Sequence, residues 1–180
     1  TMSARLRKFN LLLMTPEAAV AQLAASLLAH EIDVSILASL QQPETAAILT
    51  QIEPSARELL ERDWTAEDFE TAAVEFCRLF ILNPDAPARA AAYEDKKSLD
   101  VAGRIQFMLD SGFLELPATY QTLAPDHVAL LLLVYSSLND EDAIQFKADN
   151  LAWLPRFSER LETESRHVFY LLASRILRVV

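Results

Sequence analysis

The sequence predicts an all-α fold, and three observations carry this prediction. The 180-residue chain has only two glycines, whereas hairpin-rich β folds depend on glycine turns. Alanine and leucine, which favour helices, are abundant, and apolar residues recur at helical spacing. Because 52% of the residues are hydrophobic, a chain of this length can bury one sizeable core. We therefore expect a single helical domain over residues 1–180, with about nine or ten helices.

Helix-start signals follow one another in the first third of the chain. Residues 15–17 combine a threonine N-cap, a proline at the first helical position and an acid in the first turn. Asp33 is expected to cap a short helix that ends near Leu40, and Pro43 and Pro54 are expected to open two more. The side chains expected to face inward from these last two helices are Ala47, Ile48, Ile52, Leu59 and Leu60.

The next helix begins at residues 65–68, which resemble a capping box with Asp68 in the usual place of glutamate. Its expected core stripe is Phe69, Ala73, Phe76 and Phe80, at helical spacing. Pro84 and Pro87 then end the helix, and residues 83–97 are expected to form a loop.

The second half is expected to contain four helices. The first runs from about residue 98 to 111, with Gly112 just past its end. A loop at 113–124 follows, and it is the candidate hinge between an N-terminal part, 1–112, and a C-terminal part, 125–180. The last three helices are expected to begin near Pro125, Asn139 and Thr163, with a break at Pro155.

Composition excludes several classes of function. The net charge of −10 argues against nucleic-acid binding, which needs clustered Lys and Arg, but permits a basic partner. Two glycines are too few for a phosphate-cradling loop, and the single Cys77 excludes an intramolecular disulfide or a cysteine metal cluster. The longest apolar run is too short to span a membrane, and no signal peptide is apparent. We expect a cytoplasmic protein with no stable membrane insertion.

Two patterns of residues raise the alternative of an enzyme. Glu164 and His167 form one E-x-x-H pattern, but a di-iron bundle needs two, so a solvent-facing i, i+3 pair is the simpler expectation. Asp126 and His127 stand directly before the apolar run 128–134. Either Asp126 caps a buried helix and His127 lies exposed in its first turn, or both face a ligand, as in a metal-dependent or acid–base site.

Three segments together resemble a known family. They are "EFCRLFILNP" (75–84), "APDHVALLL" (124–132) and "NLAWLPRFSERL…VFYLLASRIL" (150–177). In order and spacing they are similar to the TorD/DmsD/NarJ family of redox-enzyme maturation chaperones, and the resemblance covers the chain from about residue 65 onward. The matching residues are Arg78-Leu79-Phe80, Tyr93-Glu94, Pro125-Asp126-His127, Trp153, Pro155 and Phe157.

The resemblance implies a cytoplasmic, all-helical, TorD-like chaperone and no enzyme. Its partner would be the twin-arginine signal peptide, or the N-terminal region, of a molybdenum-cofactor oxidoreductase subunit. The chaperone would assist the maturation of that subunit before its export or membrane assembly, as a monomer or a domain-swapped dimer. No cofactor or metal is expected. The alternatives are a helical adaptor for another protein and the metal-dependent enzyme described above.

The resemblance also implies a peptide-binding site. Glu94 and Asp126 would meet the arginines of the peptide, since carboxylates bind guanidinium groups through charge-assisted hydrogen bonds. Pro125 and His127 would border the site. The apolar part of the peptide would lie in a groove lined by Tyr93, Trp153, Leu154 and Phe157.

The chain departs from the family pattern at three places. The family usually has Gly-Pro-Gly after Leu-Phe, where this chain has residues 81–84, Ile-Leu-Asn-Pro. The proline-rich lead into Tyr-Glu is replaced by residues 88–92, and two glutamates after Asp-His are replaced by Leu131 and Leu133.

Overall fold

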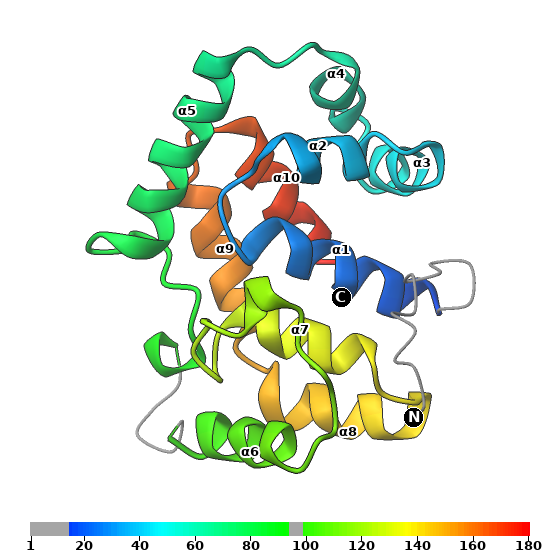
Figure 1. Ribbon diagram of the computed structural model, residues 1–180, viewed down its shortest axis with the longest axis vertical. Helices are drawn as coiled ribbons and strands as arrows, with labels where there is room; N and C mark the ends of the chain where they lie inside the picture. The colour runs from blue at the N-terminus through cyan, green and yellow to red at the C-terminus, as the bar shows by residue number, and fades with distance from the viewer. Residues whose placement is uncertain (1–14, 94–98) are drawn as a thin grey trace, which may run out of the picture.

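The computed structural model describes residues 15–93 and 99–180. Within them the chain forms ten α-helices and no strand (Figure 1), which confirms the predicted all-α single domain. The helices are α1 (Pro16–Leu28), α2 (Val34–Leu40), α3 (Pro43–Ile52), α4 (Ala56–Glu61), α5 (Ala66–Phe76), α6 (Leu99–Asp110), α7 (Val128–Ser136), α8 (Asp140–Asn150), α9 (Leu154–Glu164) and α10 (Val168–Leu177). A π-helical turn, Cys77–Ile81, extends α5, and 3-10 turns occupy Ala90–Ala92 and Ala118–Tyr120.

The helix caps predicted at Thr15, Asp33 and Thr65 are confirmed. The Thr15 hydroxyl accepts a hydrogen bond from the Ala18 N–H at 3.3 Å, and Asp33 Oδ1 accepts from the Ile36 N–H at 2.8 Å. Thr65 and Asp68 form the reciprocal capping box. These caps hold because each side-chain acceptor lies within one turn of the unpaired N–H groups that it satisfies.

Gly112 ends α6 as predicted. Its φ is +72°, a left-handed conformation that glycine adopts without the penalty of a Cβ. The Gly112 N–H donates to the Leu109 carbonyl at 3.0 Å and the Phe113 N–H donates to the Met108 carbonyl at 3.2 Å. This pair of bonds is a Schellman motif.

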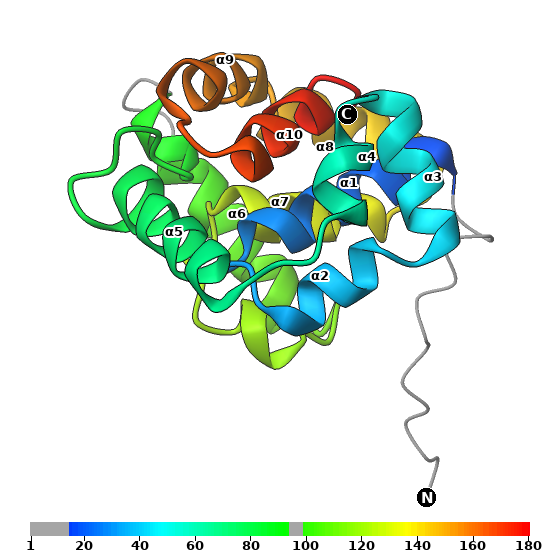
Figure 2. The ribbon, with the colours of Figure 1, turned by 90° about the horizontal axis from the view of Figure 1, so that it is seen from above.

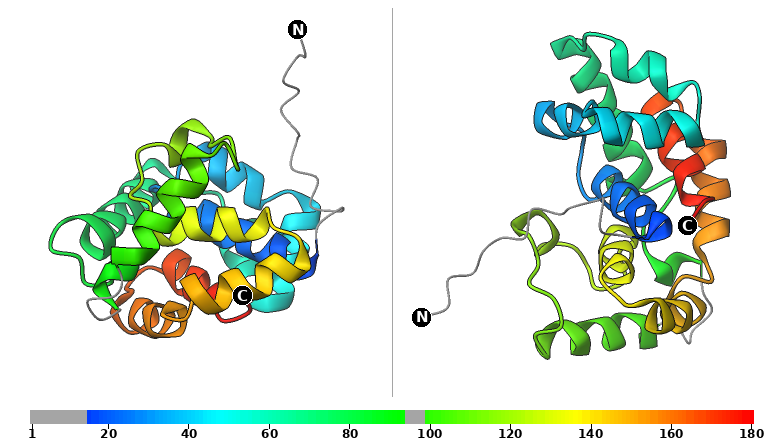
Figure 3. Two further views of the ribbon diagram at one scale, coloured as in Figure 1. Left: turned by 90° about the horizontal axis from the view of Figure 1, so that it is seen from below. Right: turned by 90° about the vertical axis from the view of Figure 1, so that its right-hand side faces the viewer.

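The core lies between α1, α7, α9 and α10. Figures 1 and 2 show α1 packed along α7, and α10 lies against both α9 and α1. All nine residues of α7 are buried, so this helix crosses the centre of the domain. Helices α3 and α4 lie at one end and α6 at the other, as both views of the long axis show (Figures 1 and 3).

One hydrophobic core joins the two parts that the sequence suggested. Helix α1, from the N-terminal part, packs on α7 and α10, both from the C-terminal part. The 113–124 segment contains the 3-10 turn, and its Tyr120 is buried. Its role as a hinge stays a prediction.

Several sequence-based boundaries were wrong. Helix α7 begins at Val128 rather than at Pro125, and α8 ends at Asn150 rather than near Trp153. Pro155 lies in the first turn of α9 and so belongs to a helix start, because first-turn positions need no N–H donor. The break in this region falls instead at residues 165–167.

The inward face of α3 was also misplaced. Ala47 is exposed, whereas Leu49 and Thr45 are buried and Ile48 and Ile52 are partly buried. Leu59 and Leu60 of α4 are buried as expected.

None of the helices in the described part of the chain combines the length and the apolar character needed to cross a membrane.

Candidate functional site

Two of the segments that carry the family resemblance, 124–132 and 150–177, bond to the loop that follows α5. Residues 88–90 lie beside 126–128, because the Ala90 N–H donates to the Asp126 carbonyl at 3.1 Å and the Val128 N–H donates to the Ala88 carbonyl at 2.8 Å. The Arg156 guanidinium donates to the Tyr93 carbonyl. The start of α7, the loop after α5 and the start of α9 therefore form one corner of the molecule.

Asp126 is the buried carboxylate of this corner, with 1% of its surface exposed. Its Oδ1 accepts a hydrogen bond from Arg89 Nε at 2.8 Å and forms an ion pair with Arg89 Nη2, also at 2.8 Å. Its Oδ2 accepts from the Ala91 N–H at 3.2 Å. The expectation that Asp126 caps α7 was wrong, because its carboxylate points to the 89–91 loop. In this structure Arg89 occupies the place that a peptide arginine was expected to take.

His127 is the N-cap of α7. Its Nδ1 accepts from the Ala129 N–H at 3.2 Å, so this nitrogen carries no proton and the ring is neutral. Burial lowers the pKa of His127 to about 4, although the neighbouring Asp126 opposes the shift. The side chain is therefore not an exposed first-turn residue, as one interpretation of the sequence had it.

We expect His127 to make the protein less stable in mild acid. Between about pH 6.5 and pH 4 the histidine of the unfolded chain takes up a proton while the folded one stays neutral, so stability falls as the pH falls. The loss should reach roughly 2–3 kcal/mol at pH 4. Urea unfolding at several pH values measures it.

The matched variant for this test is His127→Asn. Asparagine caps a helix well but does not titrate in this range, so its stability should fall less steeply over the same interval. His167, whose pKa burial also lowers, is present in both proteins and cancels in the comparison. Parallel pH profiles for the two proteins would contradict the assignment to His127.

The aromatic corner consists of Phe80, Tyr93, Trp153 and Phe157. Tyr93 stacks on Trp153 with ring centroids 5.4 Å apart, and Phe157 lies edge-on to Tyr93 at 5.8 Å. Tyr93, Trp153 and Phe157, together with Leu154, are buried. These residues were expected to line an open groove, but here they pack against one another and the corner is closed.

The two remaining residues of the expected peptide site are Pro125 and Glu94. Pro125 is partly exposed beside Asp126. Glu94 lies outside the described residues. Burial raises the pKa of Tyr93 to about 12, and its hydroxyl has no hydrogen-bond partner among the described residues.

Arg78 has a structural role that the sequence did not reveal. It donates two hydrogen bonds of 2.8 Å to the Glu75 carboxylate and also reaches Asp85 and the Glu164 carbonyl. Burial alone would raise the pKa of Glu75, but the bonds from Arg78 and from the Arg166 N–H hold it below its usual range. Arg78 thus joins the end of α5, the following loop and the end of α9.

The E-x-x-H pattern does not form a pair on one helix. Glu164 is the last residue of α9, and His167 is the N-cap of α10, with Nδ1 accepting from the Phe169 N–H at 3.2 Å. The helix break between them explains why the expected i, i+3 pair is absent. In the ranges 15–93 and 99–180, His, Cys, Asp and Glu side chains form no group of three suited to a metal ion.

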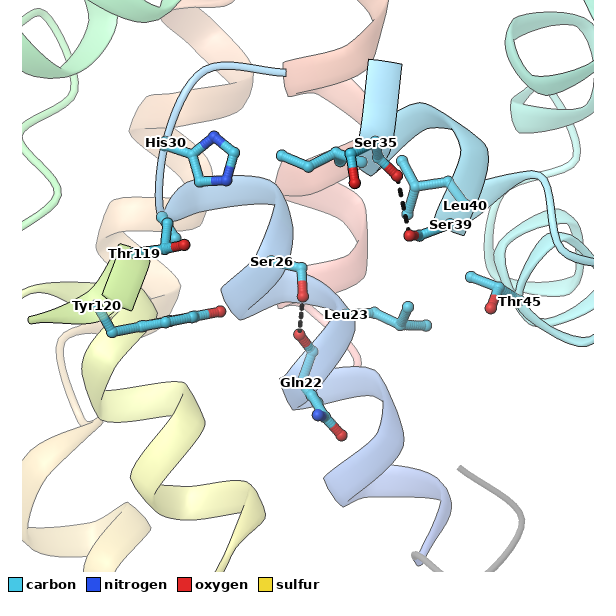
Figure 4. Close-up of a pocket in the computed structure, with 12 residues that line it drawn as sticks. Gln22, Leu23, Ser26, His30, Ser35, Ser39, Leu40, Thr45, Thr119 and Tyr120 are labelled. Carbon is cyan, nitrogen blue, oxygen red and sulfur yellow. Dashed lines mark hydrogen bonds between the residues drawn. The ribbon is translucent and has the colours of Figure 1, made fainter. Parts of the chain in front are cut away.

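A pocket that the sequence did not indicate opens between α1, α2 and the 118–120 turn (Figure 4). Its volume is about 420 Å³, within the range of small-molecule sites. It is lined by Gln22, Leu23, Ser26, Ala29, His30, Ser35, Ile36, Ser39, Leu40, Thr45, Thr119 and Tyr120. No motif marks it, because its residues come from four separate segments.

Comparisons with known proteins found no matching family model, no matching curated protein and no matching solved structure.

Proposed function

We propose that this protein is a cytoplasmic chaperone that binds the twin-arginine signal peptide, or the N-terminal region, of a molybdenum-cofactor oxidoreductase subunit. The observation that carries the proposal is the convergence of the three resembling segments. They are widely separated in the sequence, yet 124–132 and 150–177 both bond to the loop 88–93. Segments 75–84 and 150–177 meet through the rings of Phe80 and Phe157, whose centroids are 6.5 Å apart.

Two features of the first segment give further support. Residues 77–81, which include the Arg-Leu-Phe motif, form a π-helical turn. Such turns are rare in proteins, and those that occur are often found at functional sites. Asn83 has a φ of +47° and lies in residues 81–84, where the resembling family has Gly-Pro-Gly. Asparagine is among the few other residues that tolerate this conformation, so the substitution preserves the turn.

The chemistry of the corner fits a basic peptide. The chain has a net charge of −10, which favours the approach of a cationic segment. Asp126 already binds one guanidinium, that of Arg89, which is 54% exposed. A peptide arginine would take the place of Arg89 on Asp126, and the loop that carries Arg89 and Tyr93 would move to open the aromatic corner.

The decisive variant is Arg89→Gln. It removes the internal competitor for Asp126, so we expect a twin-arginine peptide to bind roughly ten- to a hundredfold more tightly than to the wild type, the equivalent of one hydrogen bond to a charged group. Calorimetric titration with the native peptide, and with a peptide whose two arginines are glutamines, measures the effect.

The gain in peptide affinity should depend on the arginines of the peptide and on the carboxylate of Asp126. It should vanish for the glutamine peptide and for the double variant Arg89→Gln/Asp126→Asn. Arg57→Gln is the control, since Arg57 pairs with Glu61 on α4, outside this corner, and should leave peptide affinity unchanged. Binding that is indifferent to the peptide arginines would refute the proposal and favour a helical adaptor for another protein.

A further inference from the structure

Two arginines of α9 bind the segment that follows α5. The Arg156 guanidinium donates through Nη1 to the Tyr93 carbonyl. The Arg160 guanidinium donates through Nε to the Asp85 carbonyl. Both acceptors belong to residues 85–93, which run beside α9 (Figure 1). Because the two arginines are four residues apart on one helix, their side chains leave the same face of α9.

Neither of these two guanidiniums has a carboxylate partner in the described part of the chain. Other arginines there do form ion pairs, namely Arg57, Arg62, Arg78, Arg89, Arg175 and Arg178. Arg156 and Arg160 are both exposed, and the carbonyl oxygens that they bind carry no net charge. Two like charges at positions i and i+4 destabilise a helix. A counter-ion for this pair would therefore be stabilising, and within residues 15–93 and 99–180 the chain provides none.

Most hydrogen-bond donors of the two guanidiniums are unused. An arginine side chain has five N–H donors, and Arg156 and Arg160 each donate one to a backbone carbonyl. These bonds hold the guanidiniums in place, so less side-chain freedom is lost when a further acceptor binds. Burial raises the pKa of Tyr93, and the charges of Arg160 and Arg156 oppose the shift. Both guanidiniums therefore lie near Tyr93, at the rim of the aromatic corner.

We propose that Arg156 and Arg160 together bind an oxyanion, the carboxylate or phosphate group of a ligand. Its oxygens accept charge-assisted hydrogen bonds from the unused N–H groups of both side chains, and such bonds are stronger than those between neutral groups. The bound anion offsets the repulsion between the two cations. Because each guanidinium keeps its carbonyl partner, the anion also fastens residues 85–93 to α9. This site is independent of the peptide-binding role proposed above.

Inorganic phosphate and acetate are the probes, and chloride at the same ionic strength is the reference. We expect phosphate to bind the full chain at neutral pH with a dissociation constant on the order of 1 mM. Protein NMR measures the affinity, and shifts of the Asp85 and Tyr93 amides locate the site. Phosphate binding at least about tenfold tighter than acetate indicates a phosphate ligand, whereas equal affinities indicate a carboxylate. Shifts that chloride reproduces would overturn the proposal.

Variants of the two arginines provide the second test. Arg156→Gln and Arg160→Gln should each weaken phosphate binding by roughly tenfold or more, the equivalent of one hydrogen bond to a charged group. Arg160→Lys keeps the charge but loses the forked donors, so its affinity should lie between those of the wild type and Arg160→Gln. Arg166→Gln is the matched control, since Arg166 is also exposed but lines a pocket beside α4, and it should bind phosphate as the wild type does. Unchanged affinity in both glutamine variants would overturn the proposal.

Hydrogen exchange tests the effect of the anion on residues 85–93. The Ala86 N–H donates to the Leu79 carbonyl at 3.0 Å, and the Ala90 N–H is also bonded, to the Asp126 carbonyl at 3.1 Å. Exchange of these two amides therefore reports opening of the segment. Phosphate at ten times its dissociation constant should slow their exchange about tenfold, and the slowing should be absent from Arg160→Gln at the same concentration. Exchange in the wild type that phosphate leaves unchanged would overturn the proposal, even if a variant failed to fold.

Discussion

Replacing Phe157 by alanine is expected to lower the free energy of unfolding by about 3–5 kcal/mol. The Phe157 side chain is completely buried, with 0% of its surface exposed. Its ring lies 5.8 Å from that of Tyr93, 5.7 Å from that of Trp153 and 6.5 Å from that of Phe80. Removing it leaves a cavity among rigid rings, which cannot collapse fully. Urea unfolding followed by circular dichroism measures the loss.

Phe107→Ala is the matched control for this prediction. Phe107 is 73% exposed on α6, so the same substitution should change stability by less than about 0.5 kcal/mol. A loss below about 1 kcal/mol for Phe157→Ala would mean that the aromatic corner is loosely packed. That result would also remove the reason to regard the corner as closed.

Replacing Arg78 by methionine is expected to cost a similar amount, about 3–5 kcal/mol. The Glu75 side chain is only 8% exposed and that of Arg78 22%, so the variant leaves a buried carboxylate without its main partner. The Asp85 side chain and the Glu164 carbonyl also lose Arg78 as a hydrogen-bond donor. Denaturant unfolding at neutral pH measures the cost.

The stability of Arg78→Met at acid pH shows why the variant is destabilised. In the wild type the pKa of Glu75 is held below its usual range, whereas in Arg78→Met burial should raise it. In the variant, Glu75 is therefore protonated at a higher pH than in the wild type, which removes its unpaired buried charge. The difference in stability between the two proteins should shrink as the pH falls through the raised pKa of Glu75. A difference that stays constant with pH would mean that lost packing, not the unpaired carboxylate, is the cause.

A double variant completes the test. Arg78→Met with Glu75→Leu removes both charges, and much of the lost stability should return, because replacing a whole buried pair by apolar groups is often nearly neutral. Arg57→Met is the control, since its pair with Glu61 is exposed on both sides and should contribute about 0–1 kcal/mol. Additive losses from the two single variants would contradict the coupling.

These results bear on how peptide-binding data should be interpreted. Arg78, Phe80 and Phe157 match the family pattern, but in this structure they hold the corner together. Their variants would lower peptide binding merely by unfolding the protein. Arg89 and Asp126 are the better probes of function, and each titration needs a melting curve of the same variant alongside it.

The helix caps show what local sequence decides. Thr15, Asp33 and Thr65 cap helices whose N–H groups lie three residues further along the chain. Gly112 supplies a positive φ at the end of the helix that it terminates. In each case the interaction closes within a single turn, so residue type and spacing contain all the information that the structure uses. The all-α fold class could be predicted for the same reason, because the scarcity of glycine and the helical spacing of apolar residues are also local features of the sequence.

Asp126 shows what spacing alone could not decide. As an N-cap it would have bonded to its own helix, but its carboxylate binds Arg89, 37 residues away in the chain, and His127 caps the helix instead. The family resemblance marked Asp126 and His127 as a pair, but it contained no information about which partner each one takes.

The pocket and the aromatic corner depend still more on tertiary packing. Gln22, Ser39 and Tyr120 become neighbours only when α1, α2 and the 118–120 turn assemble, and Tyr93 meets Trp153 only when the loop after α5 reaches α9. Local sequence determined the helix starts at Thr15, Asp33 and Thr65 and the helix end at Gly112, because their capping bonds span a few residues. Which side chains face one another, and which are closed off from solvent, was decided by contacts across tens of residues, whose free energy depends on the whole core.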